Sequence, residues 1–184
     1  GYNMNMNSGS QSGGSGAGGL RSRPRRATGE GTGVGYEAGS GYEPYIVTDV
    51  RAQMQGRTNT VYIRIPFEVT DPTRLKSLTL KLRYDDGFLA FLNGTPVASA
   101  NLSASAAWND PASAGHDDSA AVIYEPFNVS GYLSSLRPGA NILAIEGHNA
   151  GSTSSDLLFQ ALLEATETDP ASTATDDEAN TWVE

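Results

Sequence analysis

Alternating apolar and polar residues mark the middle of this chain as strand-forming. Between positions 61 and 70, apolar residues occupy every second place, from Val61 through Ile65 to Val69. This period of two is typical of a strand that buries one face. Pro66 interrupts the pattern without breaking it, and because it lacks an N–H group we expect an edge strand or a bulge there.

A second alternation, Leu78-Thr-Leu-Lys-Leu-Arg-Tyr84, predicts another strand. Asp85-Asp86-Gly87 and Asn93-Gly94 follow it and have the residues favoured in tight turns. Ser130 can cap a short helix that ends at Pro138-Gly139. Further strands are predicted over 45–51, 88–92, 95–100, 120–129, 141–147 and 156–165.

About eight strands with one short helix predict an all-β fold, an antiparallel jelly-roll β-sandwich with long low-complexity termini. We expect the sandwich to occupy residues 41–166. Residues 1–40 contain 12 of the 21 glycines and form a Gly/Ser/Arg-rich tail, either flexible or used for docking. Residues 167–184 carry six acidic residues and no basic one, which is typical of an acidic tail.

The charge of the chain is unevenly divided. The net charge is −9, but residues 1–40 carry four Arg and two Glu (4 − 2 = +2), so the remainder carries 8 − 19 = −11. An acidic chain is a poor partner for nucleic acid. The sequence has no run of 18 apolar residues, so we expect no transmembrane segment, and the absence of Cys excludes disulfides and thiolate metal sites.

The runs Leu78–Val97, with its Asp-Asp-Gly and Asn-Gly turns, and Phe127–Gly147 carry a family resemblance. They are similar to the galactose-binding-like jelly roll, which includes the sugar-binding β-sandwich of family-2 glycoside hydrolases. A closer resemblance is to modules of large exported bacterial proteins of planctomycete type, often beside lamin-tail-like domains. The resemblance covers roughly residues 34–166. It implies a periplasmic or extracellular module that binds glycan or protein, or that serves as a spacer.

Two groups of carboxylates are candidates for metal binding. Asp85 and Asp86 could hold Ca²⁺ through oxygen ligands or take part in acid–base chemistry, although a turn role before Gly87 is the favoured interpretation. Asp110, Asp117 and Asp118 form a second possible cluster of oxygen ligands, without the spacing of an EF-hand. Ca²⁺ is therefore the one cofactor we consider, and none is required by the pattern.

The segment 101–119 is long for a sandwich loop, and long loops are often functional. Trp108 could stack on a sugar ring while Asn109, Asp110 and His116 bond its hydroxyls, or Trp108 could be a plug that holds the loop down. His116 and His148 do not have the spacing of a zinc site. No Gly-x-Ser-x-Gly elbow is present, and we expect no enzymatic activity.

Two functions follow from these features. The first is an accessory subunit that docks on a larger extracytoplasmic or membrane-bound assembly through its N-terminal tail. The second is a carbohydrate-binding module that uses the loop of Trp108. The candidate docking residues in the tail are Tyr2, Met4, Met6, Arg21, Arg23, Arg25 and Arg26.

Overall fold

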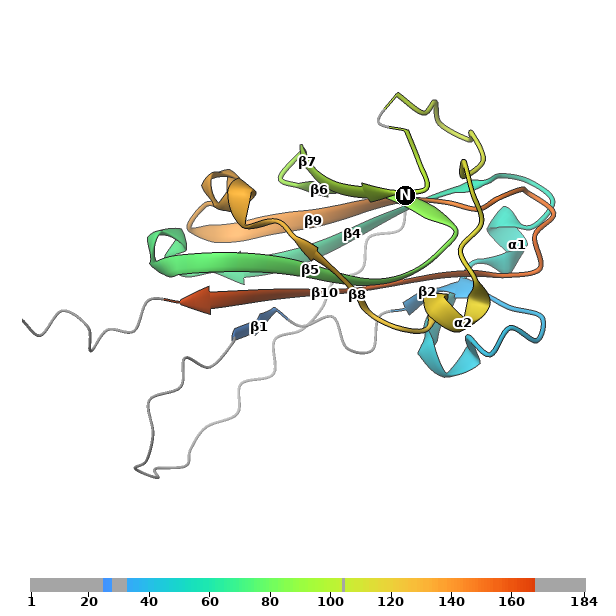
Figure 1. Cartoon of the computed structure of the whole chain (residues 1–184), viewed down its shortest axis with the longest axis horizontal. Helices are drawn as coiled ribbons and strands as arrows, with labels where there is room; N and C mark the ends of the chain where they lie inside the picture. The colour runs from blue at the N-terminus through green and yellow to red at the C-terminus, as the bar shows by residue number, and fades with distance from the viewer. Residues whose placement is uncertain (1–24, 28–32, 104, 168–184) are drawn as a thin grey trace, which may run out of the picture.

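The structure is a computed structural model that describes residues 25–27, 33–103 and 105–167. These residues form an all-β sandwich of two sheets (Figure 1). The first sheet has the strand order β3-β2-β10-β5-β8, with β1 also paired to β10, and the second has the order β4-β9-β6-β7. The predicted all-β sandwich is confirmed.

The elements follow one another with short connections, apart from the segment between β7 and α2. Helices are few and brief: η1 (Glu43–Tyr45), α1 (Arg51–Met54), η2 (Pro72–Arg74), α2 (Asp118–Ala121) and η3 (Ser130–Ser135). None of the helices in the described ranges has the length and hydrophobicity that crossing a membrane requires. The strands are β1 (Arg25–Ala27), β2 (Gly33–Tyr36), β3 (Ile46–Asp49), β4 (Thr60–Val69), β5 (Leu75–Asp85), β6 (Gly87–Leu92), β7 (Thr95–Ala100), β8 (Glu125–Asn128), β9 (Gly139–His148) and β10 (Leu157–Glu167).

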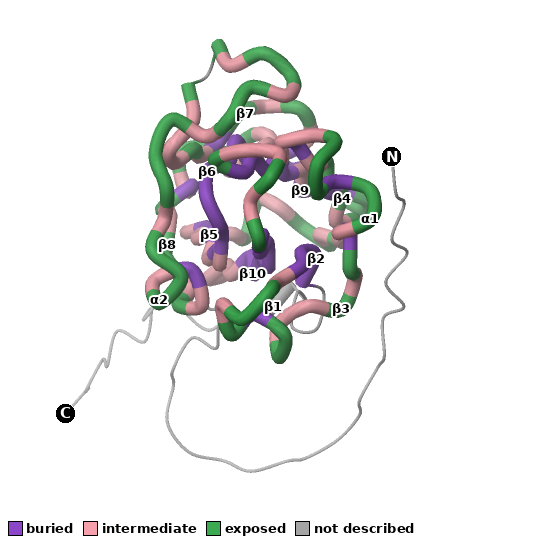
Figure 2. Tube along the Cα trace, turned by 90° about the vertical axis from the view of Figure 1, so that its right-hand side faces the viewer, coloured by how far each residue is buried: buried purple, intermediate pink, exposed green. Residues whose placement is uncertain are grey.

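The alternating runs form the strands that their period predicts. Among the described strands, β4 pairs only with β9, so Pro66 lies on an edge strand as expected. The inward residues of β5, such as Leu80 and Leu82, are completely buried. They pack between the sheets with Phe88 and Phe159, in the layer that Figure 2 shows as the buried interior.

Strand β2 lies before residue 41, where the sandwich was expected to begin. Its Val34 and Tyr36 are buried in the main core, and β2 pairs parallel to β3, so the sandwich is not purely antiparallel. Its glycines are the reason that no strand was predicted here. Glycine permits the close backbone approach, because a Cβ on Gly35 would overlap the carbonyl oxygen of Leu157.

The predicted strand over 120–129 is wrong in its first half. Residues Asp118–Ala121 form α2, and the strand β8 begins only at Glu125. The carbonyl oxygen of Asp117 accepts hydrogen bonds from the N–H groups of Ala120 and Ala121, which closes a helical turn. Alanine favours helix over strand, and this local preference decides the segment.

The turn predicted at Asp85-Asp86-Gly87 does not make a hairpin. Strand β5 belongs to one sheet and β6 to the other, so these residues carry the chain across the sandwich. Asn93-Gly94 does make the predicted hairpin between β6 and β7, with positive φ values of 49° and 88°.

Candidate functional site

The loop between β7 and α2 presents Trp108 to solvent. Trp108 is 70% exposed, the opposite of what a plug requires. It sits in a turn closed by two hydrogen bonds, since the N–H of Asp110 donates to the carbonyl of Ala107 (3.1 Å) and the Asp110 carboxylate accepts from the N–H of Ala107 (2.8 Å). The indole is therefore exposed on a turn of defined shape.

Asn109 fastens this turn to the start of β4. Its side-chain Oδ1 accepts from Thr58 Oγ1 and from the Asn59 N–H, both at 2.6 Å. Its carbonyl accepts from Asn59 Nδ2 at 2.7 Å, and its N–H donates to Thr60 Oγ1 at 3.0 Å. Asn109 also has a positive φ of 69°, which Asn tolerates better than most residues. Four hydrogen bonds thus fix the residue beside Trp108.

A polar network continues from this turn over the outer face of the second sheet. The ring of His148 is fully buried, and its Nδ1 lies 2.6 Å from the Asp110 carbonyl oxygen. A carbonyl oxygen only accepts, so Nδ1 is the donor. Nε2 lies 3.1 Å from Oε1 of Glu146, and the same carboxylate oxygen accepts from the Tyr62 hydroxyl at 3.1 Å.

Tyr62 is the second exposed aromatic of this end, with 49% of the residue accessible. It is two residues beyond Thr60 on β4 and shares its face of the sheet. Partial burial, followed by the charge and hydrogen bond of Glu146, raises the pKa of the Tyr62 phenol. The hydroxyl therefore stays protonated and held in one direction. Hydrogen bonds of Asn109, Asp110 and His148 connect the turn that carries Trp108 to this end of the outer face, and we call Trp108, Tyr62 and Glu146 the Trp108 platform.

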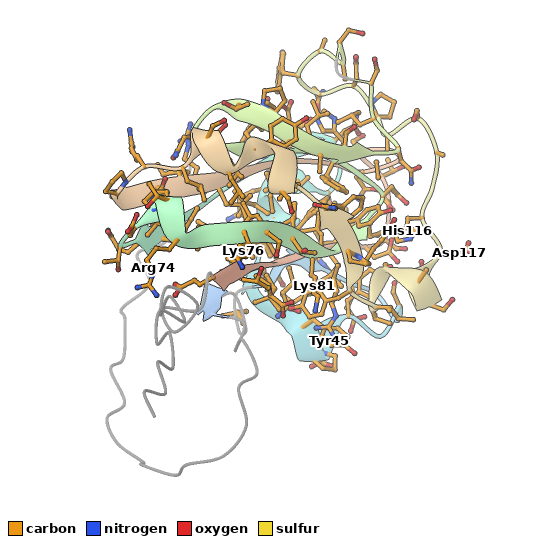
Figure 3. The ribbon with its side chains drawn as sticks, turned by 60° about the vertical axis from the view of Figure 1, so that its left-hand side comes forward. Tyr45, Arg74, Lys76, Lys81, His116 and Asp117 are labelled. Carbon is orange, nitrogen blue, oxygen red and sulfur yellow. The ribbon has the colours of Figure 1, made fainter. Side chains whose placement is uncertain are left out.

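The other predicted ligand-binding residues have different surroundings. The ring of His116 stacks on Tyr84 (centroids 4.2 Å apart, 14° between planes), and its Nδ1 lies 2.8 Å from the Tyr84 carbonyl oxygen. Figure 3 shows His116 beside Asp117, ahead of α2. Asn109 and Asp110 use their polar atoms to hold the turn, so of the predicted ligand-binding residues it is Trp108 that presents an open surface.

Asp85 and Asp86 are buried, with exposed fractions of 2% and 7%, and lie where the chain passes from β5 to β6. The Asp86 carboxylate accepts from the N–H groups of His116 (3.0 Å) and Ala150 (2.6 Å), and its carbonyl accepts from Asn101 Nδ2 (3.0 Å). It therefore ties the long loop to the strand ends. Burial, and then the neighbouring charge of Asp86, raise the pKa of Asp85 to about 9, so Asp85 is neutral at pH 7.

The residues expected to hold a metal are not grouped as a metal site, although the charges of Asp86 and Asp118 both raise the pKa of Asp85. Asp118 Oδ1 accepts a hydrogen bond from the Tyr42 hydroxyl at 3.4 Å, while the Asp117 carbonyl begins α2. Within ranges 33–103 and 105–167, no three His, Asp or Glu side chains are grouped so that they could hold a metal ion. Of the candidate docking residues, Tyr2, Met4, Met6, Arg21 and Arg23 lie outside the described residues, and Arg25 and Arg26 belong to β1.

The sequence did not predict three parts of this site: Tyr62, Glu146 and residues 58–60, which hydrogen-bond to Asn109. Tyr62 occupies one of the polar positions in the alternating sequence of β4, so the sequence already indicated that its side chain points outward. That Glu146 and His148 connect it to the loop carrying Trp108 was not foreseeable, because that connection depends on the path of the loop. His148 was expected to be a hydrogen bonder at a loop end, and its buried ring makes such bonds.

No family model matches the chain, and no curated protein matches it. Among solved structures, the native α-L-rhamnosidase from Aspergillus terreus is similar, with 16% identity and a TM-score of 0.38. The match covers 60% of this chain and 13% of the rhamnosidase. The chain thus corresponds to a small part of that protein. Fold class rests on the two sheets themselves, which form an all-β sandwich.

Proposed function

We propose that this chain is a non-catalytic carbohydrate-binding module and that the Trp108 platform is its binding site. The observation that carries the proposal is the exposed Trp108 side chain on a turn fastened by Asn109 to β4. Exposing an indole forfeits a large gain from burial. An exposed indole on a turn that hydrogen bonds hold in place suits a surface on which a flat, apolar partner stacks.

The surroundings of Trp108 fit a sugar ring. A pyranose has an apolar face of C–H groups, which stacks on an aromatic ring, and an edge of hydroxyls, which needs fixed donors and acceptors. Tyr62 supplies a second ring, and the Glu146 carboxylate supplies acceptor oxygens on a side chain that is 16% exposed. Nε2 of the buried His148 and the hydroxyl of Tyr62 both lie 3.1 Å from Oε1 of that carboxylate.

A glycan array followed by calorimetric titration of the hits tests this proposal. We expect Trp108→Ala to abolish binding and Trp108→Phe, which keeps an aromatic face, to retain part of it. The matched control is Ile123→Ala, because Ile123 is 65% exposed and lies on the other side of α2.

Fluorescence gives an independent measure. The chain has two tryptophans, so in a Trp182→Phe background Trp108 alone reports. Sugar stacking should shift or quench its emission. Binding that survives Trp108→Ala, or an array without hits together with unchanged emission, contradicts the proposal.

A further inference from the structure

The imidazole of His148 lies between two groups that accept hydrogen bonds and do not donate them. Nδ1 is 2.6 Å from the carbonyl oxygen of Asp110, and Nε2 is 3.1 Å from Oε1 of the Glu146 carboxylate. A neutral imidazole has a single N–H group, so it can donate to one of these oxygens and not to both. The complete arrangement therefore needs one further proton, shared by His148 and Glu146.

The surroundings of the ring offer no substitute for this proton. The His148 side chain is fully buried, and its remaining hydrogen-bond partner among the described residues is the Thr60 hydroxyl, 3.3 Å from Nδ1. Its register partners, Thr60 on β4 and Gly87 on β6, carry no charge. The loop covers Gly87, because a Cβ there would lie 2.6 Å from the carbonyl oxygen of Asn101. Bulk solvent therefore cannot supply the missing hydrogen bond.

The other titratable groups near the pair are already engaged. The Tyr62 hydroxyl donates to the same Glu146 oxygen at 3.1 Å. The carboxylates of Asp110 and of Asp86, the residue before Gly87, accept hydrogen bonds from backbone N–H groups. Arg64, the next outward residue of β4 after Tyr62, is exposed and has Ala144 as its register partner. The charge that faces the His148 ring is therefore that of Glu146.

We propose that His148 is a positioning residue: the proton on its Nε2 holds Glu146 beside Tyr62, and loss of that proton releases the carboxylate and weakens glycan binding at the Trp108 platform. The second part rests on the proposed function. The Asp110 contact is the shorter one and its carbonyl belongs to a hydrogen-bonded turn, so the neutral ring keeps its hydrogen on Nδ1. A lone pair of Nε2 then faces Oε1, which is unfavourable in a buried site. Because 16% of the Glu146 side chain is exposed, the carboxylate can turn to solvent.

An NMR titration of the ligand-free, full-length chain from about pH 5 to about pH 9 tests the first part. We expect the His148 ring to change from two N–H groups to one, on Nδ1, and the Glu146 carboxyl and Tyr62 ring signals to follow the same midpoint. The chain has two histidines, so a His116→Gln variant assigns the ring signals. A ring that does not titrate, that keeps its hydrogen on Nε2, or whose midpoint Glu146 and Tyr62 do not share overturns the proposal.

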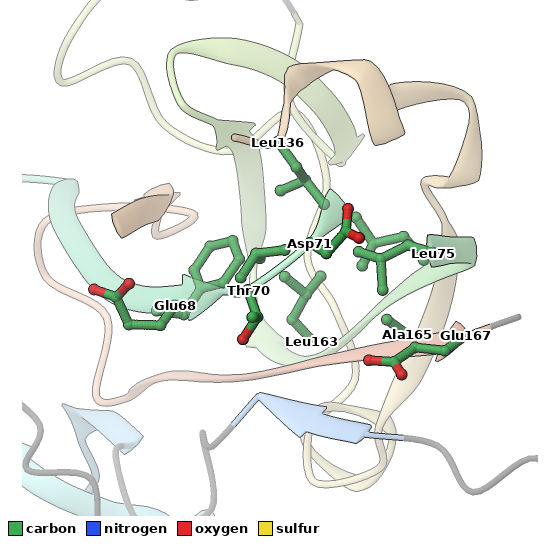
Figure 4. A pocket seen from close by; sticks show the side chains of 11 residues that line it. Glu68, Thr70, Asp71, Leu75, Leu136, Leu163, Ala165 and Glu167 are labelled. Carbon is green, nitrogen blue, oxygen red and sulfur yellow. The ribbon is translucent and has the colours of Figure 1, made fainter. Parts of the chain in front are cut away.

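Matched glutamine variants locate the effect. In Glu146→Gln the amide can donate to Nε2 of a neutral ring, so the Tyr62 signals should become independent of pH in this range. The control is Glu68→Gln, which should respond as the wild type does. Glu68 shares its face of β4 with Tyr62 but lies at the opposite end of the sandwich, where it borders a cavity of about 180 Å³ between the ends of β4, β5 and β10 (Figure 4). A response that persists in Glu146→Gln, or that Glu68→Gln abolishes, overturns the proposal.

Calorimetric titration of the wild type with a glycan hit, at one pH on either side of the midpoint, tests the second part. The affinity should be roughly two- to tenfold lower at the higher pH, through the loss of a fixed acceptor. Equal affinity at the two pH values overturns the regulation. Absence of binding at both means instead that the proposed function fails, and the ligand-free titration still decides where the proton lies.

Discussion

The two ends of the sandwich are built in opposite ways. At the platform end, which we define as Asp85–Gly87, the loop 101–117 and the Trp108 platform, buried polar groups hold the loop and an aromatic ring is left in solvent. At the cavity end, apolar side chains such as Leu136 and Leu163 surround the hollow, and the charges remain at its mouth. Strand β4 joins the two ends, with Thr60 at one and Glu68 at the other.

This difference shows that stability and recognition depend on different groups at the two ends. At the platform end, hydrogen bonds carry the structure, so removing Trp108 should change recognition and leave the fold intact. At the cavity end, the apolar side chains are themselves part of the core, so a truncation there should change stability directly. Each prediction below tests one side of this comparison.

The largest effect should come from the buried carboxyl of the platform end. The pKa of Asp85 rises from 3.8 in the unfolded chain to about 9 in the folded chain. Between these two pH values the unfolded chain has released a proton that the folded chain keeps. The contribution of Asp85 to the free energy of unfolding therefore falls as pH rises, by at most roughly 1.4 kcal/mol per pH unit. Asp85→Asn mimics the neutral acid, and its advantage over the wild type should grow between about pH 4 and about pH 8.

Urea unfolding of both proteins across this range measures the difference. The matched control is Asp71→Asn at the cavity end, where the pKa is lowered instead. An Asp85→Asn advantage that stays constant with pH would show that Asp85 is ionised in the folded protein.

A truncation at the cavity end should have the next largest effect. Leu136 is 7% exposed and lines the cavity, so Leu136→Ala should lower the free energy of unfolding by about 2–4 kcal/mol through lost burial and an enlarged hollow. Chemical unfolding gives the value. A loss below about 1 kcal/mol would mean that neighbouring groups close over the gap.

Replacing Asn109, which bonds the turn of Trp108 to residues 58–60, should have a smaller effect on stability. Asn109→Ala deletes the acceptor for Thr58 and Asn59 and places Ala at a positive φ, so we expect a loss of about 1–3 kcal/mol. Asn109→Asp keeps an acceptor oxygen and tolerates that φ, so it should lose less. Hydrogen exchange of the 105–110 amides should rise more in the Ala variant than in the Asp variant, and equal rates would contradict the assigned role.

Much of the fold was predictable because strand period is a local property. The alternations at Val61–Val69 and Leu78–Tyr84 predicted β4 and β5, and Asn93-Gly94 predicted the hairpin. Strand β2 was not predictable in this way. Its glycines are required by close contacts with Tyr45 and Leu157, which exist only after the sheets have assembled. The Asp-Asp-Gly segment has turn chemistry, but its path between the sheets is set by tertiary structure.

The candidate site was predictable only in part for the same reason. The length of the loop and its tryptophan singled out Trp108, and the structure places that side chain in solvent. The polar residues beside it were assigned to ligand, whereas Asn109 and Asp110 bond to the protein. Sequence reveals which groups can form hydrogen bonds but not which partner they reach, and that choice depends on residues 58–60 and 148.

Among these variants, Trp108→Ala should change stability least and glycan binding most. With 70% of Trp108 already exposed, Trp108→Ala should alter the free energy of unfolding by no more than about 0.5 kcal/mol. A tryptophan that plugs the loop would lose about 3–5 kcal/mol on the same substitution. Thermal and urea unfolding of the variant, beside its titration with the glycan hits, therefore separate the two roles. A destabilisation comparable to that of Leu136→Ala would make the two ends alike and remove the basis for assigning recognition to the platform.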